Sequence, residues 1–383
     1  MKIVYCTPSL YIAGGIERVL TSKANYLASQ GDKYDVTIIL TDGYGKEPFY
    51  HLSDKVRLVN LNIGFEELWE LSFFRKIPVY LKKQRLFKRR LTEELMRLKP
   101  DITVSTLRRE INFITDIPDG SKKIGEIHIN RQNYRNFSDG STSPVKRLFA
   151  KWWMWRLTKK LKRLDKFVVL TEEDMHSWQE LDNVCVIPNP LPFVPAEKSA
   201  LTEKRVIAVG RYSHEKGIDL LLRAWSIASK ELPGWRLCTY GTGNREPYLQ
   251  LARELHLDES QYELCSAVEN IGQEYLNSSL FVLSSRFEGF GMALVEAMSY
   301  GLAAVAFNCP TGPKHIISNG KDGILVENGN IQELANTLVR VAGNSGLMTS
   351  LGHEAAQTAQ RFAIGEIGRR WEELFHQLAP HSV

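Results

Sequence analysis

The stretch "SSRFEGFGMALVEAMSYGLAAVAF" (284–307) places two carboxylates, Glu288 and Glu296, in an otherwise apolar sequence. From Met292 onward its residue types favour a helix, Gly301 fits the end of that helix, and the last residues have the pattern of a buried strand. Nearly every face of the helix is apolar, so we expect it to be buried. A carboxylate there is costly without partners, so Glu296 either joins a structural hydrogen-bond network or faces a polar ligand.

Glu288 lies just before the predicted helix, in a turn that contains Gly289 and Gly291. Backbone N–H groups at the start of a helix point outward and favour anions. A carboxylate at this place would compete with a bound phosphate, so we expect Glu288 to accept hydrogen bonds from nearby hydroxyl groups. On residue types alone, a ligand-binding role and a structural role stay equally open for both acids.

Strand and helix patterns alternate along the whole chain. In the first half, strands are predicted at 2–7, 34–40, 56–61, 101–106, 123–129, 166–171 and 183–188, with a helix at 16–30 after the first strand. In the second half, strands are predicted at 204–210, 235–241, 262–266, 280–285, 302–307 and 322–326, with helices at 217–232, 244–256 and 330–343.

The region 188–204, "PNPLPFVPAEKSALTEK", holds four prolines and no apolar period, and it is predicted to be a linker. A length of 383 residues also suggests two domains. We therefore predict an α/β fold with two Rossmann-like, doubly wound parallel-sheet domains, 1–190 and 191–364, which face each other across a cleft.

The composition is that of an ordinary globular protein, and no apolar run reaches the length of a membrane span. The N-terminus has a strand pattern rather than that of a signal peptide. The five cysteines show no CxxC spacing, which is typical of buried, reduced thiols in a cytoplasmic protein. The sequence contains no HExxH, Cys/His cluster or GxSxG motif.

Ligands bind such sheets at the carboxyl ends of the strands, so the loops after strands are the candidate sites. Arg211 and Lys216 follow one strand and could converge on a diphosphate; the alternative is two solvated charges. Gly14 and Gly15 would let a ligand approach the start of a helix, or they form an ordinary tight turn. His128 ends a strand of the first domain and has a structural role as its alternative.

A clear Asp-x-Asp pair for a divalent metal is missing from the sequence. The charge of a bound diphosphate would then fall to Arg211, Lys216 and the helix start at 291–293. We therefore expect no metal site.

Two basic stretches lie in the first half of the chain. Residues 75–99 hold ten Lys or Arg, and residues 146–166 hold nine, with Trp152, Trp153 and Trp155 among them. Solvated helices with inward-facing aromatic residues would explain this pattern, and so would helices on an anionic lipid surface. Nucleic acid is not expected, because no motif that reads it accompanies the charge.

Together these stretches resemble the retaining glycosyltransferases of the GT-B class, and in particular their family 4. Glu288 and Glu296 match the E-x7-E signature of that family, "VGRYSHEKGID" its diphosphate loop, and "PSLYIAGGIERVL" its glycine loop and first helix. Other stretches that resemble the family are "KPDITVST", "VVLTEEDM", "VIPNPLPF" and "GPKHIISNGKDGILV", so the resemblance covers nearly the whole chain.

The resemblance implies a retaining, metal-independent hexosyltransferase without a cofactor. It would move a hexose from a nucleotide sugar, expected to be UDP-linked, to a glycan or lipid-linked glycan acceptor in bacterial-type surface polysaccharide or lipopolysaccharide synthesis. The domain 1–190 would bind the acceptor, and 191–364 would bind the nucleotide sugar. A C-terminal helix at about 365–383 would pack back on the first domain. We expect a cytoplasmic protein, peripheral on the inner face of the cytoplasmic membrane.

The resemblance also implies a role for each candidate residue. Glu296 would bind the ribose hydroxyls of the nucleotide, and Glu288 the hydroxyls of the donor sugar. The remaining donor-binding groups would be Gly14, Gly15 and the backbone around Phe290, Gly291 and Met292. His128 would contact the sugar near C6, and Arg211 and Lys216 would stabilise the charge on the leaving phosphate. The family offers no obvious protein nucleophile, and attack is thought to occur on the face from which the diphosphate departs.

Two other functions remain compatible with the residues. A nucleotide-sugar epimerase on a similar two-domain scaffold would also use acids and a His, but it would leave the basic first half unexplained. A catalytically silent binding or scaffold protein would keep the fold, although the presence of all four charged candidates speaks against it.

Overall fold

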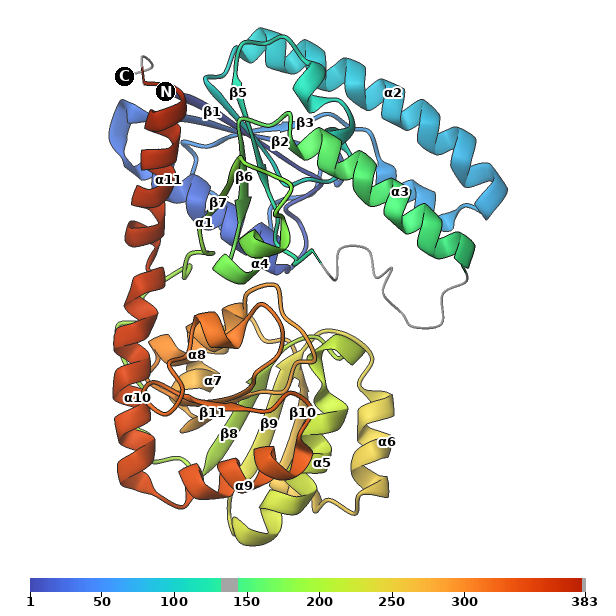
Figure 1. Ribbon diagram of the computed structural model, residues 1–383. Helices are drawn as coiled ribbons and strands as arrows, with labels where there is room; N and C mark the ends of the chain where they lie inside the picture. The colour runs from blue at the N-terminus through green and yellow to red at the C-terminus, as the bar shows by residue number, and fades with distance from the viewer. Residues whose placement is uncertain (132–143, 381–383) are drawn as a thin grey trace. The chain divides into compact units, whose positions relative to one another are not determined.

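The chain forms two compact units in the computed structural model, which describes residues 1–131 and 144–380 (Figure 1). The N-terminal unit contains Met1–Pro192 and Ile364–Val383, and the C-terminal unit contains Phe193–Ala363. The chain therefore passes from one unit to the other inside the proline-rich region that was predicted to be a linker, and it returns near its end.

The N-terminal unit is built on a seven-stranded sheet in the order β3-β2-β1-β4-β5-β6-β7. Every neighbouring pair in this sheet is parallel. The strands are β1 (Lys2–Thr7), β2 (Asp35–Leu40), β3 (Arg57–Asn60), β4 (Ile102–Ser105), β5 (Lys122–Glu126), β6 (Lys166–Val169) and β7 (Val184–Val186). The chain starts in the middle of the sheet and winds first to one edge and then to the other, so the strand order reverses between β1 and β4.

Among its described residues, this unit has the helices α1 (Gly15–Ser29), α2 (Phe73–Leu98), α3 (Pro144–Leu161), α4 (Glu172–Ser177) and α11 (Ile364–Leu378). The C-terminal helix α11 runs beside α1 (Figure 1). Trp371 and Phe375 of α11 share a buried cluster with Leu20 and Leu27 of α1. The end of the predicted helix 365–383 lies partly outside the described residues.

The C-terminal unit repeats this winding with six strands in the order β10-β9-β8-β11-β12-β13, again all parallel. They are β8 (Arg205–Val209), β9 (Arg236–Gly241), β10 (Tyr262–Ser266), β11 (Leu280–Leu283), β12 (Ala303–Phe307) and β13 (Ile324–Val326). The order reverses between β8 and β11. Strand β12, which lies between β11 and β13, is buried along its whole length, as expected for a parallel strand that is covered on both faces.

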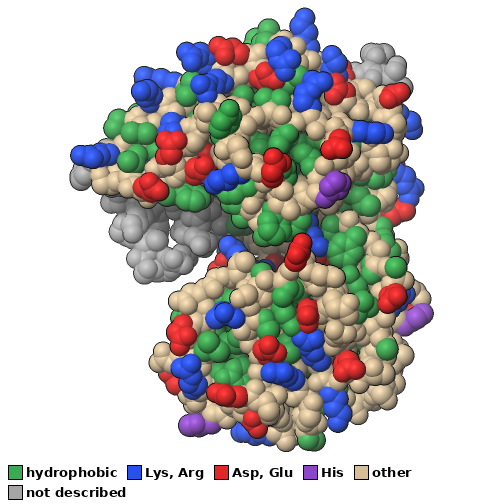
Figure 2. Space-filling model, turned by 180° about the vertical axis from the view of Figure 1, so that it is seen from behind, with side chains coloured by type: hydrophobic (Ala, Val, Ile, Leu, Met, Phe, Trp, Pro, Cys, Tyr) green, Lys and Arg blue, Asp and Glu red, His purple; other side chains and the backbone are tan. Residues whose placement is uncertain are grey.

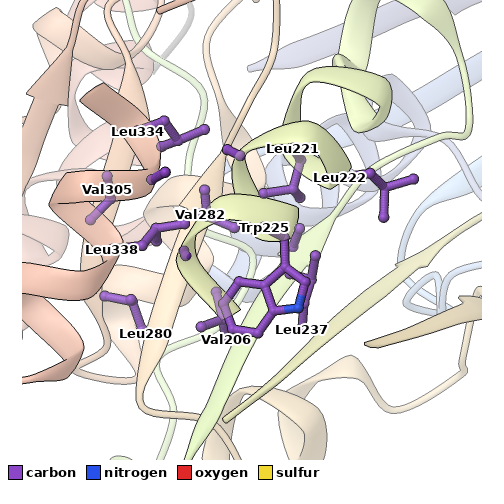
Figure 3. Close-up of a cluster of buried hydrophobic side chains, with 14 of the residues drawn as sticks. Val206, Leu221, Leu222, Trp225, Leu237, Leu280, Val282, Val305, Leu334 and Leu338 are labelled. Carbon is purple, nitrogen blue, oxygen red and sulfur yellow. The ribbon is translucent and has the colours of Figure 1, made fainter. Parts of the chain in front are cut away.

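The helices of this unit are α5 (Ile218–Ala228), α6 (Glu246–Glu254), α7 (Ile271–Leu276), α8 (Met292–Ser299), α9 (Ile331–Ala342) and α10 (Ser345–Ala359). Trp225 of α5 lies in the core among aliphatic side chains of the sheet and of α9 (Figure 3). The labelled neighbours in that view include Val206, Leu237, Leu280 and Leu338.

Helix α10 was not predicted from the sequence. Its buried residues include Gly352, Ala355 and Ala356, which carry only a weak apolar signal. A Cβ atom at Gly352 would lie 2.2 Å from the carbonyl oxygen of Gly301, at the turn between α8 and β12. The position of α10 therefore depends on close packing against the turn at Gly301. The apolar periodicity of the sequence does not reveal such a contact.

The prediction of two doubly wound parallel sheets is confirmed by both topologies. All five cysteines lie among the described residues, and no disulfide joins them. In the part of the chain that the structure describes, no helix combines the length and the apolar character that crossing a bilayer requires.

Candidate active site

The candidate site of the C-terminal unit lies where the strand order of its sheet reverses. The loop 210–217 follows β8, the loop 284–291 follows β11, and these two strands are hydrogen-bonded neighbours. In doubly wound sheets, ligands bind at this kind of reversal, beyond the carboxyl ends of the strands. Both loops had been singled out from the sequence.

Lys216 and Glu288 connect these two loops directly. The Lys216 ammonium donates to Glu288 Oε1 at 2.7 Å, and the Ser285 hydroxyl donates to the same oxygen at 2.6 Å. Glu288 is only 7% exposed, so its carboxylate needs such partners. The expectation that a neighbouring hydroxyl would donate to Glu288 is therefore met by Ser285.

A close backbone approach brings the two loops into this contact. Gly217 has a φ of +61°, and a Cβ atom there would lie 2.1 Å from the carbonyl oxygen of Ser284. The Ser284 hydroxyl in turn donates to the carbonyl oxygen of Lys216 at 3.0 Å. Only glycine allows this crossing, because any side chain would strain the backbone and clash with it.

Arg286 holds the outer part of the same junction. Its guanidinium donates to both carboxylate oxygens of Asp219, at 2.8 and 2.7 Å, and to the carbonyl oxygen of His214 at 2.8 Å. The hydrogen bonds to Asp219 raise the pKa of Arg286. A two-point pair of this kind fixes geometry as well as charge, so Arg286 anchors the loop 284–291 to the start of α5.

Arg211 takes a different position from Lys216. Its side chain is 67% exposed and donates to Glu215 in its own loop at 2.8 Å. Each of the two predicted cations is thus paired with a separate carboxylate. Of the two, Lys216 is the one that contacts Glu288.

A third loop, after β12, closes around Glu288, and it was not predicted. The Thr311 hydroxyl donates to the carbonyl oxygen of Glu288 at 2.7 Å, and a Cβ atom at Gly312 would lie 2.7 Å from the Glu288 Cβ. Thr311 has a φ of +62°, which is an outlier for a β-branched residue. Strained backbone of this kind clusters at functional sites.

Helix α8 starts at the end of the glutamate loop with no side-chain cap. Gly291 is its N-cap residue, with a φ of +104°, and a glycine has no side chain to cap the first N–H groups. Phe290 is buried and packs edge-on against Phe362, with ring centroids 5.4 Å apart. The start of α8, at Gly291 and Met292, therefore carries the partial positive charge of a helix N-terminus.

Glu296 occupies the fifth position of α8 and is 4% exposed. The hydroxyl of Tyr275, on α7, lies 3.5 Å from its Oε2. Glu288 and Glu296 thus lie before and within one short helix, as predicted. Their surroundings differ, because Glu288 accepts a hydrogen bond from Lys216, whereas Glu296 lies beside the hydroxyl of Tyr275.

The remaining predicted residues belong to the N-terminal unit. Gly14 and Gly15 follow β1 at the start of α1, where the sheet order also reverses. A Cβ atom at Gly14 would lie 2.0 Å from the Glu17 carboxylate, whereas one at Gly15 would meet no atom. Glu17 therefore folds back over the first turn of α1.

His128 follows β5 and lies in a buried polar cluster. Its Nε2 is 3.3 Å from Glu126 Oε1, and Glu126 also pairs with the buried Lys23 of α1. Burial lowers the pKa of His128 to about 4, although the Glu126 carboxylate opposes that change. The ring is therefore neutral at physiological pH.

Sequence reasoning found Arg211, Lys216 and Glu288 in these loops but missed Arg286 and the neutral residues around Glu288 and Glu296. Ser285, Thr311 and Tyr275 are common residue types with no distinguishing local pattern. Arg286 stands inside the quoted stretch, but its partner Asp219 is 67 residues away. For the loop after β12, the sequence Pro310-Thr311-Gly312 was the one local sign of an irregular loop.

The neutral His128 makes stability depend on pH. Between its folded pKa of about 4 and the ordinary value of 6.5, the unfolded chain binds a proton that the folded chain does not. Stability is therefore highest above the unfolded value and falls as the pH drops toward 4. We expect His128→Gln to flatten the slope of unfolding free energy against pH in this window, by up to about 1.4 kcal/mol per pH unit.

Urea unfolding at several pH values between these limits measures the slope. His353→Gln, at an exposed position on α10, is the matched control and should leave the slope unchanged. Equal slopes in the wild type and in His128→Gln would contradict the neutral, buried state of His128.

Comparisons with known proteins show which proteins this chain is similar to. Residues 193–358 match the family model of the glycosyl transferases group 1. An uncharacterized glycosyltransferase of Haemophilus influenzae is 28% identical over 383 residues, which cover 97% of this chain and 99% of the relative. The GalNAc-α-(1→4)-GalNAc-α-(1→3)-diNAcBac-PP-undecaprenol α-1,4-N-acetyl-D-galactosaminyltransferase of Campylobacter jejuni is 25% identical over 99% of both chains.

Among solved structures, a TarM variant of S. aureus in complex with fondaparinux, α-GlcNAc-glycerol and UDP has a TM-score of 0.76. It is 16% identical, and the match covers 98% of this chain and 99% of that one. At this identity the likeness concerns the fold. The C-terminal unit, which carries the Lys216–Glu288 junction and α8, thus matches the glycosyl transferases group 1, and both curated relatives described above that span the whole chain are glycosyltransferases.

Proposed function

We propose that the protein is a retaining hexosyltransferase that takes a sugar from a UDP-linked donor. The observation that carries this proposal is the junction in the C-terminal unit, where Lys216 contacts the buried Glu288 at the strand-order reversal and helix α8, which carries the buried Glu296, starts directly after it. A nucleoside diphosphate sugar needs these groups, because it presents negative phosphates beside two sets of hydroxyls.

The two acids divide the donor between them. Glu296, inside α8, accepts hydrogen bonds from the ribose hydroxyls, and Glu288, before the helix, accepts them from the donor sugar. They are eight residues apart, with the helix start between them, so the diphosphate falls at the N–H groups of Gly291 and Met292. The different partners of the two acids support different roles.

The leaving diphosphate is stabilised by positive charge from the chain. Lys216 is held beside Glu288, and from there its ammonium group can also contact a phosphate of the bound donor. Arg211 is exposed on the same loop and can turn from Glu215 to the phosphate. Stabilising groups of this kind typically contribute about 3–4 kcal/mol to catalysis. The acceptor hydroxyl then attacks C1 of the sugar on the face from which the diphosphate departs, the bond from C1 to the phosphate oxygen breaks, and the hydroxyl proton passes to that oxygen, without a protein nucleophile.

We propose that this transfer needs no divalent metal. Among the described residues, no group of three or more His, Cys, Asp or Glu side chains is arranged to hold one. Lys216, Arg211 and the start of α8 supply the positive charge instead.

The donor and acceptor classes are inferred from the relatives. The TarM structure contains UDP, which supports a UDP-linked donor for this chain. The Campylobacter jejuni enzyme is named for an undecaprenol-linked glycan, which supports a glycan or lipid-linked acceptor in surface polysaccharide synthesis. In this proposal the N-terminal unit binds the acceptor, and Gly14, Gly15 and His128 stand at the ends of its strands.

Incubation with UDP-glucose, UDP-galactose and their N-acetylated counterparts tests the proposal through release of UDP. We expect release from one donor, unchanged by EDTA, and a decrease of roughly 10²-fold or more in Lys216→Ala. Lys230→Ala, at the other end of α5, is the matched control. Conversion of the donor sugar without UDP release would favour the epimerase, and no turnover of any donor would favour the binding protein. Loss of activity in EDTA that Mg²⁺ or Mn²⁺ restores would refute metal independence.

Calorimetry with free UDP separates the two acids. Glu296→Gln should weaken UDP binding roughly 10-fold or more, because a carboxylate accepts from both ribose hydroxyls and an amide has one oxygen. Glu288→Gln should change UDP affinity much less. Glu259→Gln, at an exposed position before β10, is the control. Equal losses in the Glu288 and Glu296 variants would contradict the division of roles.

Helix α3 supports a peripheral position on an anionic membrane. Trp152 and Trp155 are 46% and 54% exposed, and they stack with Arg156 and Lys159. Trp153 instead packs against the core, as do Tyr80 and Phe87 of α2, so the inward-facing interpretation holds for these aromatic residues. A surface hollow of about 540 Å³ is lined by Trp152, Trp155, Arg156, Lys159, Lys160 and Arg163.

The cations of α2 add to this basic surface, and Figure 2 shows Lys and Arg side chains gathered over the N-terminal unit. Some of them have structural roles, since Lys83 and Arg90 donate to the carbonyl oxygens of Ile63 and Leu61. Exposed tryptophans beside cations suit the interface of a bilayer, where each cation contributes about 1 kcal/mol.

Flotation with phosphatidylglycerol vesicles tests membrane binding. We expect binding at low salt that weakens at high salt and on changing Lys159, Lys160, Lys162 and Arg163 to Ser. The matched control changes four exposed cations of the C-terminal unit, Arg223, Lys230, Arg253 and Lys321, to Ser and should still float. If the wild-type protein does not bind the vesicles at low salt, membrane binding is contradicted and α3 is a solvated helix.

A further inference from the structure

The loop after β12 has an unfavourable backbone conformation at Thr311. Its φ of +62° lies in the left-handed region, which a β-branched residue rarely adopts. Glycine or asparagine would occupy this region at a lower cost. Thr311 is also only 4% exposed, so its side chain is enclosed by the C-terminal unit. Because the backbone does not favour a threonine here, the reason for it lies in the contacts of its side chain.

The side chain of Thr311 ties its loop to Glu288. The hydroxyl oxygen lies 2.7 Å from the carbonyl oxygen of Glu288 and 2.9 Å from that of Pro310. A hydroxyl has one proton to donate, and the contact to Glu288 is the shorter of the two. This hydrogen bond joins the loop after β11 to the loop after β12. The glycine that the backbone would prefer could not form it.

The left-handed turn at Thr311 also brings the following residues against the glutamate loop. A Cβ atom at Gly312 would lie 2.7 Å from the Cβ of Glu288, so the two backbones are in close contact. The Cδ1 of Ile316 lies 3.5 Å from the position that a Cβ atom at Gly291 would take. The segment that starts at Thr311 therefore packs along the loop from Glu288 to the first residue before α8.

The position of the Glu288 backbone decides where its carboxylate lies. Lys216 and Ser285 donate to Glu288 Oε1 at 2.7 and 2.6 Å, and both distances change if the backbone of Glu288 moves. Groups that bind a substrate must be held within about 0.5 Å of their productive position. The contacts of Thr311 and Gly312 with the Glu288 backbone supply this constraint.

We propose that Thr311 is a positioning residue, whose left-handed backbone and hydroxyl group hold Glu288 where its carboxylate can distinguish donor sugars. The role of Glu288 toward the sugar rests on the proposed function, whereas the hold on Glu288 rests on the geometry alone. Strained backbone persists only where its surroundings enforce it, and here it maintains the position of a buried acid. Thr311 thereby becomes a further determinant of donor specificity.

Steady-state kinetics of Thr311→Gly test this role, with the UDP-sugar that the release assay identifies and with its C4 epimer. Glycine accepts the same φ but has no hydroxyl, so the variant should fold while Glu288 is no longer held. We expect kcat and the discrimination between the epimers to fall roughly 10-fold each, because small displacements are costly in catalysis. Affinity for free UDP should change less than about twofold, since the ribose and phosphate contacts remain. Thr311→Ser keeps the hydroxyl and should retain most of the activity and discrimination.

A second variant and a matched control separate positioning from effects on folding. Gly312→Ala leaves Thr311 in place but sets a Cβ atom against that of Glu288, so it should lower kcat and discrimination in the same way. His256→Gly is the control for the change in backbone, because His256 is exposed after α6 and has a φ of +53°. It should leave the kinetics unchanged. Unchanged discrimination in folded Thr311→Gly, or equal losses of kcat and UDP affinity in it, would overturn the proposal.

A double-mutant cycle measures the hold on Glu288 without any turnover. Glu288→Gln should lower the midpoint of thermal unfolding, because it leaves the partly buried Lys216 without its carboxylate. In the Thr311→Gly background this decrease should be smaller by roughly half, since residues in contact do not act additively. The His256→Gly background should show the full decrease. Equal decreases in the Thr311→Gly and wild-type backgrounds would contradict the hold on Glu288. If no UDP-sugar is turned over, the proposed function fails, and the cycle still decides whether Thr311 positions Glu288.

Discussion

The ion pair between Lys216 and Glu288 is the contact around which the C-terminal site is organised. It joins the loops after β8 and β11, which are neighbours only because the strand order reverses there. A buried carboxylate needs this cation, and the cation reaches it because Gly217 lets its loop cross the backbone at Ser284. The direction of α8 and the position of its first N–H groups follow from the same junction.

The two units have the same type of doubly wound sheet, but each holds a different cluster of charged and polar side chains. In the C-terminal unit, a partly exposed cation meets a buried acid, so charge is available to a phosphate at the strand ends. In the N-terminal unit, Lys23 and Glu126 are both enclosed, and their charges act on the neutral ring of His128. The two centres therefore differ in the charge that they present near the ends of their strands.

The apolar periodicity and the loop chemistry of the sequence were sufficient to predict both sheets, the linker and most helices. Strands buried on both faces read as continuous apolar runs, and glycines mark the turns between them. Helix α10 was missed although Met348 and Leu351 are buried in it, because the rest of its buried face consists of Gly and Ala, whose small side chains give little apolar signal. Its place depends on close contact with the turn at Gly301.

The sequence by itself determined which charged residues stand at the ends of strands, among them Lys216, Glu288 and His128. Only the tertiary structure decided which groups meet. Lys216 and Glu288 are 72 residues apart, and Lys23 and Glu126 are 103 apart. No local sequence pattern predicts such pairs. The apolar periodicity indicates whether a side chain faces the core, but not which polar group it will contact there. Ser285 was recognised for the same reason, once the fold had brought its hydroxyl and Lys216 to the same oxygen of Glu288.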